Sequence, residues 1–295
     1  MIPSVSGTDI PVLTSGQYST VYNLFSLVIA SMLFTALFLL LSQGRVAPRY
    51  RTALVVSATV CGIATYHYFR IFENFRESYP AGATVGADHL LSNIEFNEAY
   101  RYVDWLLTVP LLLVETIAVM ALARSASRAL LWKLVPASAL MIVLGYPGEI
   151  ATDMGVRALW GGLSTIPFLY LLYVLFVELS KSVARQPIQV QNSIKRLRIS
   201  LLALWGVYPI VYLFPIIGGD FFGGPNGFVL RQAGYSIADI LAKAAYALVI
   251  YKIARIKSGL EDSQYSEDEV APEDEVAPGA ASAPARLRAS AASRA

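Results

Sequence analysis

Two carboxylates and an arginine interrupt the apolar stretch RYVDWLLTVPLLLVE, residues 101–115. Charged side chains are costly in such surroundings and usually serve a function there. On a helix, Arg101, Asp104 and Thr108 share one face, because they are three and four residues apart. Glu115 follows Asp104 by eleven residues, which is close to three turns and returns to that face about 16 Å further along the axis. One helix therefore presents two proton-exchanging groups at different depths.

A second apolar stretch, DILAKAAYALVIY, contains Lys243 with Asp239 one turn before it. One interpretation is a buried structural ion pair that orients helices. The other is covalent chemistry, because desolvation favours the neutral amine that attacks a carbonyl compound to form a Schiff base. If that imine is protonated, Asp104 and Asp239 are its natural counter-ions. The isolated lysine and the carboxylates on one stripe favour the second interpretation.

Membrane-spanning helices must position these residues. The chain has 295 residues, of which 56% are hydrophobic and 15% charged, and its mean hydropathy of +0.53 is too high for a soluble domain. Apolar runs long enough to cross about 30 Å of hydrocarbon lie at residues 20–42, 52–72, 100–122, 130–147, 159–179, 199–218 and 232–253. The sequence predicts an all-α membrane protein, a bundle of seven transmembrane helices in the cell membrane.

The distribution of basic residues predicts the orientation of the bundle, because lysine and arginine in short loops stay in the cytoplasm. The bases that follow odd-numbered spans are Arg45, Arg49, Arg51, Arg124, Arg128, Lys133, Lys181, Arg185, Lys195, Arg196, Arg198, Lys252, Arg255 and Lys257. The other loops hold only Arg70, Arg76, Arg157 and Arg231. We expect the N-terminus outside and the C-terminus inside. The net charge of +2 then reflects topology and does not indicate a nucleic-acid partner.

The ends of the chain differ in composition from the spans. Residues 1–19 are polar and rich in turn formers, and we expect an extracellular segment that is retained before the first span. From about Glu261 the chain is acidic and then rich in Ala, Pro and Ser, with EDEVAP occurring twice. We expect residues 256–295 to form a disordered cytoplasmic tail. Cys61 is the only cysteine, which excludes an intrachain disulfide, and no metal site is expected.

RYVDWLLTVPLLLVE followed by DILAK closely resembles the microbial rhodopsins, which are seven-helix retinal proteins. WGVYPIVY at residues 205–212 and STIPFLYLLYVLF at 164–176 extend the resemblance, which covers residues 20–255 as a retinal-binding domain. It implies that Lys243 carries all-trans retinal as a protonated Schiff base. Asp104 would accept the Schiff-base proton and Asp239 would complete the counter-ion. Arg101 and Thr108 would line the proton pathway, with Arg101 on the exit side.

The set Asp104, Thr108 and Glu115 is similar to that of proteorhodopsin-like and xanthorhodopsin-like outward proton pumps. Chloride pumps replace the acceptor with a neutral group, and sodium pumps use Asn, Asp and Gln. The resemblance implies that Glu115 is the proton donor, whose apolar surroundings favour the neutral acid. It also implies that His67, in YHYF, hydrogen-bonds to Asp104. The transported ion would be the proton, and the protein would be a transporter and not an enzyme.

The resemblance also assigns a retinal pocket. Its members are Tyr68, Trp105, Leu112, Met141, Gly145, Ser164, Phe168, Trp205, Tyr208, Pro209 and Tyr212. Leu112 matches the residue of green-absorbing relatives. Gly161 matches the glycine that opens the retinal site towards a carotenoid antenna in xanthorhodopsin-like proteins. Alternatively, Gly161 and Gly162 simply allow close approach of helices.

Two other functions remain open from the sequence. One is a photosensory receptor that signals through a partner protein, although sensory members commonly have a non-carboxylic residue where Glu115 stands. The other is a lysine-containing transporter without a chromophore. Relatives form trimers or pentamers, so a homo-oligomer in the lipid bilayer is expected.

Overall fold

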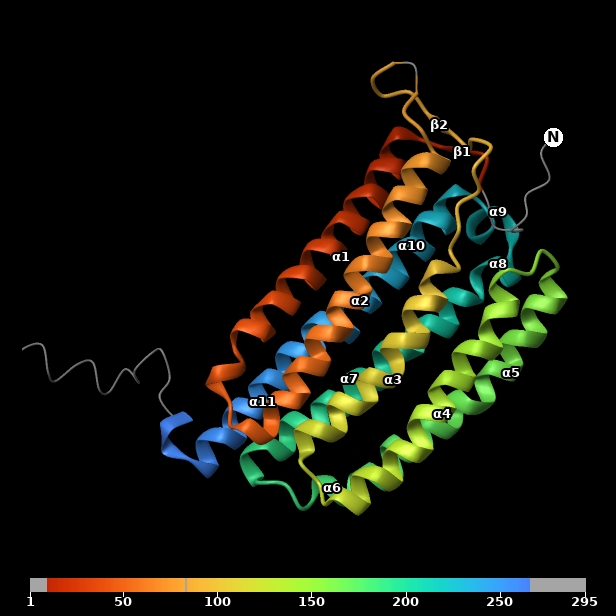
Figure 1. Ribbon diagram of the computed structural model, residues 1–295. Helices are drawn as coiled ribbons and strands as arrows, with labels where there is room; N and C mark the ends of the chain where they lie inside the picture. The colour runs from red at the N-terminus through yellow and green to blue at the C-terminus, as the bar shows by residue number, and fades with distance from the viewer. Residues whose placement is uncertain (1–9, 83, 266–295) are drawn as a thin grey trace, which may run out of the picture.

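The computed structural model describes residues 10–82 and 84–265, most of which form helices that pack side by side (Figure 1). Seven helical rods make up the bundle. They are α1 (Ser15–Leu41), α2 (Pro48–Ser78), α3 (Tyr100–Met120), α4 (Arg124–Glu149), a fifth rod of α5 (Met154–Tyr173), η2 (Val174–Glu178) and α6 (Leu179–Val183), α7 (Ile188–Tyr212), and a seventh of α10 (Pro225–Asp239), η3 (Ile240–Ala245) and α11 (Tyr246–Glu261). The predicted all-α bundle is confirmed.

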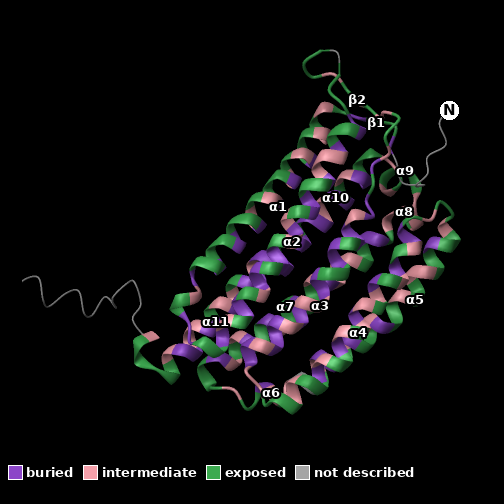
Figure 2. Cartoon of the chain, in the orientation of Figure 1, coloured by how far each residue is buried: buried purple, intermediate pink, exposed green. Residues whose placement is uncertain are grey.

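The outer surface of the bundle is apolar. Within the described residues, six helices are long and apolar enough to cross a membrane. The seventh rod is divided by the π-helical η3, so it is assigned as shorter helices. Large apolar side chains such as Phe34, Leu41 and Ile166 are exposed, and buried residues gather on the inward faces of the rods (Figure 2). The exposed surface suits a lipid solvent, and the bundle encloses the few charged groups that lie within the apolar stretches.

Two helix ends differ from the predicted segment boundaries. Helix α1 begins at Ser15, because Thr14 and Gln17 form a capping box that starts the helix before the apolar run. At the other end, α11 continues to Glu261, and a 3-10 turn, η4, covers Ser263–Tyr265. Residues 256–261, which the sequence assigned to the tail, are therefore helical. Most of the predicted tail, residues 266–295, lies outside the described residues.

A two-stranded sheet closes one end of the bundle. Strand β1 (Val12–Leu13) pairs antiparallel with β2 (His89–Leu90), and the His89 ring stacks on Tyr18 with a centroid separation of 3.7 Å. The short helices α8 (Phe214–Ile217) and α9 (Gly219–Phe222) lie at the same end, whereas α6 and the end of α11 lie at the other (Figure 1). A further 3-10 turn, η1, covers Gln43–Arg45.

Two arginines that the sequence placed in loops are buried in helices. Arg157 in α5 is fully buried and forms an ion pair with Glu149 at 2.8 Å. Arg231 in α10 is 3% exposed and forms an ion pair with Glu98 at 2.7 Å. The assignment of these two arginines to loops was wrong, because both lie in helices, where a carboxylate partner offsets the cost of leaving water. The end of the bundle that carries Arg157 and Arg231 therefore exposes even fewer basic side chains to solvent than the sequence suggested.

Candidate functional site

The centre of the bundle holds one amine between two carboxylates. Lys243 Nζ donates a hydrogen bond to Asp104 Oδ2 and lies 3.2 Å from Asp239 Oδ1. All three side chains are at most 1% exposed. Asp104 comes from α3, whereas Asp239 and Lys243 come from adjacent turns of the seventh rod. The structure thus joins the residues that the two apolar stretches singled out.

The local backbone at Lys243 is unusual. Lys243 lies in η3, a π-helical segment between α10 and α11. A π-helical turn holds one more residue than an α-helical turn, and such turns frequently occur at functional sites. It offsets the faces of α10 and α11 from each other, so one rod can present Asp239 and Lys243 to the site while both halves stay packed.

The two aspartates differ in their hydrogen bonds. Asp239 Oδ2 accepts a hydrogen bond from Tyr68 at 2.7 Å, and its Oδ1 accepts from Tyr208 at 2.6 Å and from Trp105 Nε1 at 3.3 Å. Asp104 Oδ1 is buried without a hydrogen-bond partner among the described residues. Asp239 is therefore saturated with donors, whereas Asp104 retains a free acceptor oxygen.

His67 does not form the predicted hydrogen bond with Asp104. Within the described residues no such bond is found, and His67 Nδ1 is itself buried without a partner. The His67 ring packs edge-on against Tyr66 instead, with a centroid separation of 5.2 Å. The residue lies inside the bundle as expected and is 8% exposed.

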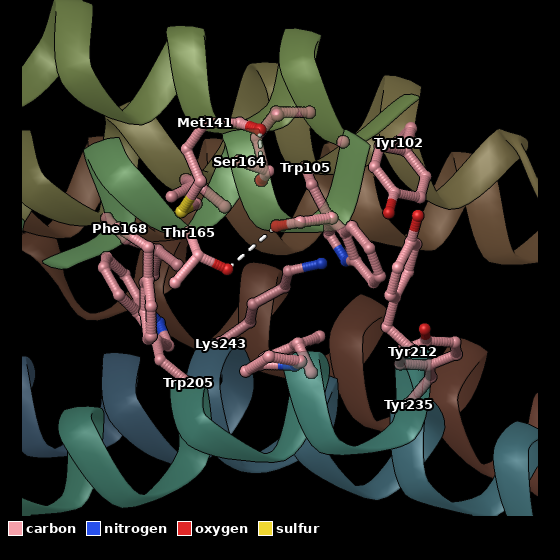
Figure 3. Close-up of a pocket in the computed structure, with 17 residues that line it drawn as sticks. Tyr102, Trp105, Met141, Ser164, Thr165, Phe168, Trp205, Tyr212, Tyr235 and Lys243 are labelled. Atoms are coloured by element: carbon pink, nitrogen blue, oxygen red, sulfur yellow. Dashed lines mark hydrogen bonds between the residues drawn. The ribbon is translucent and has the colours of Figure 1, made fainter. Parts of the chain in front are cut away.

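An aromatic cavity extends from Lys243 between the helices (Figure 3). The space between its side chains is about 810 Å³, including the part that is continuous with the outside. It is lined by Tyr102, Trp105, Val109, Leu112, Met141, Ile142, Gly145, Gly161, Ser164, Thr165, Phe168, Trp205, Tyr208, Pro209, Tyr212, Tyr235 and Lys243. An amine that lines an apolar cavity fits an aldehyde with a long apolar chain, which is the chemistry of retinal.

Most residues assigned to the pocket line this cavity, with one exception. Tyr68 is not a lining residue, and its hydroxyl donates to Asp239 instead. The sequence missed Tyr102, Val109, Ile142, Thr165 and Tyr235. Helical spacing could have found three of them: Tyr102 and Val109 lie one turn on either side of Trp105, and Tyr235 lies one turn before Asp239.

The aromatic walls are in mutual contact. The Trp105 ring meets the rings of Tyr208 and Tyr235 edge-on at centroid separations of 5.0 and 5.3 Å. Gly145 allows the opposite wall to come close, because a Cβ there would lie 2.9 Å from Tyr102 Cε1. Aromatic rings thus form much of the cavity wall, which suits an apolar polyene.

Gly161 lines the cavity and contacts Tyr212. A Cβ at Gly161 would lie 2.6 Å from Tyr212 Cε1, and the Tyr212 hydroxyl donates to the Arg157 carbonyl at 2.8 Å. The space left by the missing side chain is thus partly taken by the tyrosine ring. The alternative role of Gly161, close approach of helices, accounts for its contact with Tyr212. An opening towards lipid would have to lie next to the Tyr212 ring.

Glu115 lies beyond Lys243, on the opposite side from Arg101. It is fully buried, and neither carboxyl oxygen has a hydrogen-bond partner of ordinary geometry among the described residues. The Ser57 hydroxyl is a polar neighbour. Next to Glu115, the Thr116 and Tyr246 hydroxyls meet at 2.5 Å and join α3 to α11. An ionised carboxylate would be uncompensated here, so this environment suits the neutral acid.

Arg101 belongs to a second buried charge cluster, at the end of the bundle near the sheet. It donates to Gln232 at 2.7 Å, and its guanidinium lies 3.6 Å from Glu98, which also binds Arg231. Burial alone would raise the pKa of the Glu98 carboxyl, but Arg231 and Arg101 outweigh it and hold the pKa below its ordinary value. Glu98, which the sequence reasoning missed, therefore links α3 and α10 as an anion.

Comparisons with known proteins place the chain among retinal proteins. The family model described as bacteriorhodopsin-like protein matches residues 20–257. Green-light absorbing proteorhodopsin of Gamma-proteobacterium EBAC31A08 is 30% identical over 233 residues, 78% of this chain and 84% of that protein. Among solved structures, xanthorhodopsin, described as a light-driven ion pump with dual chromophore, is 46% identical with a TM-score of 0.80, and thermophilic rhodopsin is 44% identical with a TM-score of 0.81. Each alignment covers 86% of this chain and 99% of the solved one.

Proposed function

This chain belongs to the bacteriorhodopsin-like family of light-driven ion transporters, and from that premise we propose that it pumps protons outward across the cell membrane. The observation that carries the proposal is the row Glu115, Lys243 and Asp104, in which one buried amine lies between a free carboxylate oxygen and an unpartnered carboxyl group. Lys243 would hold retinal as a Schiff base, and the bound group would supply light absorption and an acidic proton at Nζ.

Asp104 is the proposed proton acceptor. It contacts Lys243 Nζ directly, and one of its oxygens is free of hydrogen bonds. Asp239 accepts three hydrogen bonds from Tyr68, Tyr208 and Trp105, which stabilise its charge and make it the poorer base. Asp239 therefore remains the fixed counter-ion while Asp104 takes the proton from Nζ.

Glu115 is the proposed donor that returns a proton to Lys243 Nζ. Among the described residues Glu115 forms no ion pair, and a buried carboxyl of this kind is stable only as the neutral acid, which holds a proton ready for transfer. Asp104 and Glu115 lie on the same helix, so the transfers on the two sides of Nζ have a fixed direction along its axis. The direction is outward if the N-terminus lies outside, as the distribution of basic residues predicts.

Arg101 with Glu98 and Arg231 forms the proposed exit side. Their charges lie between Asp104 and the sheet-bearing end of the bundle. A protonated Asp104 would face the field of two arginines and one carboxylate, which favours release of its proton away from Lys243. Thr108 donates to the Asp104 carbonyl at 2.8 Å, one turn from the acceptor on the same helix face.

A carotenoid antenna is a separate part of the proposal. It is supported by Gly161 on the cavity wall and by the dual chromophore of the xanthorhodopsin relative. After reconstitution with a carotenoid, light absorbed in the carotenoid bands should drive pumping, and Gly161→Trp should remove that contribution while the retinal band, perturbed through Tyr212, still drives pumping. An action spectrum that lacks those bands would exclude the antenna. Assembly as a trimer or pentamer remains a prediction.

Illumination of the protein in vesicles or cells tests the pump. Cells that contain retinal should acidify the medium in light, and a protonophore should abolish the change. A pH change that persists with the protonophore, or no change in light, would contradict proton pumping and favour the photosensory alternative.

A further inference from the structure

Lys257 is a buried lysine that the proposed cycle does not use. It lies in α11 and is 5% exposed. Its ammonium donates to the carbonyls of Val119 and Met120 and to Gln186 Oε1, each at 2.9 Å, and it lies 4.9 Å from the Tyr50 ring centroid. All three acceptors are uncharged oxygens. A buried ammonium held in this way is costly and marks a specific role.

The carbonyl acceptors are the free end of α3. Helix α3 ends at Met120, because Ala121 takes a left-handed conformation with φ of 49°. The last carbonyls of a helix have no partner within it and carry the negative end of the helix dipole. Lys257 satisfies two of them from another helix, so it fixes the end of α3 to α11.

Gln186 adds a third segment to this contact. It lies in the turn between α6 and α7, accepts a hydrogen bond from Lys257, and donates through Nε2 to the Met120 carbonyl at 3.1 Å. Lys257, Gln186 and the end of α3 thus form a closed polar ring that joins three parts of the chain. These segments meet at the end of the bundle opposite to the sheet (Figure 1).

The ring lies between Glu115 and this end of the bundle. Val119 and Met120 follow Glu115 by four and five residues, about one turn along α3. Lys257 follows Tyr246 by eleven residues and so shares its face of α11. Tyr246 contacts Thr116, the neighbour of Glu115. The ring is therefore placed about one helical turn beyond Glu115, next to the contact on α11 that covers the carboxyl.

We propose that Lys257 and Gln186 close the proton entrance to Glu115, and that the ring must open before Glu115 is reprotonated. This rests on the proposed role of Glu115 as donor. The ammonium repels an incoming proton, and its hydrogen bonds hold the turn between α6 and α7 against α3. Opening separates Gln186 from Met120 and Lys257 and admits water to the carboxyl.

Flash kinetics of Lys257→Met and Gln186→Ala in vesicles test the entrance. Both variants should speed proton uptake from the bulk by up to about tenfold, the change expected when hydrogen bonds of ordinary net strength no longer oppose opening. Transfer from Lys243 to Asp104 and the visible absorption maximum should not change. Lys257→Arg keeps the cation and its donors and should restore slow uptake.

The matched control is Lys252→Met, which removes an exposed lysine from the same helix. Hydrogen exchange of the amides in the turn at residues 184–190 is a second measurement that does not depend on pumping. It should accelerate in Lys257→Met and Gln186→Ala but not in Lys252→Met. If Lys257→Met does not fold, Gln186→Ala carries both measurements.

The outcomes separate the two proposals. Unchanged exchange in the turn would overturn the ring as a closure, whether or not the protein pumps. Faster exchange with unchanged proton uptake in a pumping protein would overturn its role as the entrance. Loss of light-driven transport in the unaltered protein would contradict the pump itself, and the exchange data would still decide whether Lys257 and Gln186 hold the turn.

Discussion

At the scale of single residues, Asp104 and Asp239 differ in what they can do for Lys243, although both are buried beside it. Asp239 is held by Tyr68, Tyr208 and Trp105, whereas one oxygen of Asp104 has no partner among the described residues. Two groups of the same chemical type therefore divide the work of stabilising a cation and accepting its proton.

Asp104→Asn should stop proton transfer from Lys243. The amide cannot accept the proton, and loss of a positioned general base typically costs a factor of about 10² to 10⁴ in rate. Flash absorption should show the loss of the deprotonated state, and light-driven acidification should cease. Asp88→Asn, an exposed change in the loop before β2, is the control. Pumping by Asp104→Asn at the normal rate would contradict the assignment.

Glu115→Gln should slow reprotonation of Lys243 Nζ sharply and leave the colour nearly unchanged. The amide fits the same buried space but holds no transferable proton, and it lies outside the cavity lining. Time-resolved absorption after a flash measures the recovery. Normal recovery would show that another group supplies the proton.

Residue spacing predicted the centre of the site, because Asp104, Asp239 and Lys243 are charged residues that stand within two apolar stretches of the sequence. It did not predict Glu98, whose importance arises from Arg101 and Arg231 on two different helices. The contacts of the His67 ring could not be predicted either, since the side chain can rotate without any change in sequence pattern. Contacts between helices decide such features, and they are absent from a single stretch of sequence.

At the scale of elements, the rods are joined at both ends by buried polar contacts. Glu98 links the start of α3 to α10 through Arg231 and Gln232, and Lys257 links the end of α3 to α11. The helix carrying both proposed proton groups is thus fixed at its two termini. The sequence predicted the rods from apolar runs but not these links, because each involves residues far apart in the chain.

Glu98→Gln should destabilise the protein at neutral pH by about 3 kcal/mol, because removing the anion leaves two buried arginines uncompensated. The pKa of Glu98 is below its ordinary value in the folded protein, so its contribution is present above that ordinary value, near 4. It is lost as the pH falls through the lower folded pKa. Thermal melts should therefore converge for variant and unaltered protein in acid.

Glu77→Gln, an exposed change at the end of α2, is the control for this measurement and should leave the melting temperature unchanged. A constant difference between Glu98→Gln and the unaltered protein from neutral pH down to pH values below both pKa values would contradict an ionised Glu98.

At the scale of the whole molecule, the protein is an apolar shell around a polar axis. Exposed Phe34, Leu41 and Ile166 face outward, whereas the charged residues Glu98, Arg101, Asp104, Lys243 and Glu115 are buried along the interior. The mean hydropathy predicted the shell, and the charged residues within apolar stretches predicted the axis. The cavity is a property of the assembled bundle.

Retinal uptake tests the assembled cavity. Protein produced without retinal should be colourless and should gain a visible band, expected in the green from Leu112, when all-trans retinal is added. Lys243→Arg should prevent the band, because a guanidinium does not form the imine, whereas Lys252→Met should not. A visible band in Lys243→Arg would place the attachment elsewhere.

The pairing of β1 with β2 bears on how the chain is assembled during synthesis. Val12 pairs with Leu90, so the first two helices and both strands are present before Arg101 and Asp104 are translated. The pair α1 and α2, held together by the strands, can therefore form before α3 is synthesised, and α3 can pack against it. Weakening the pairing of β1 with β2 would impair insertion of the later helices more than it would destabilise the folded protein.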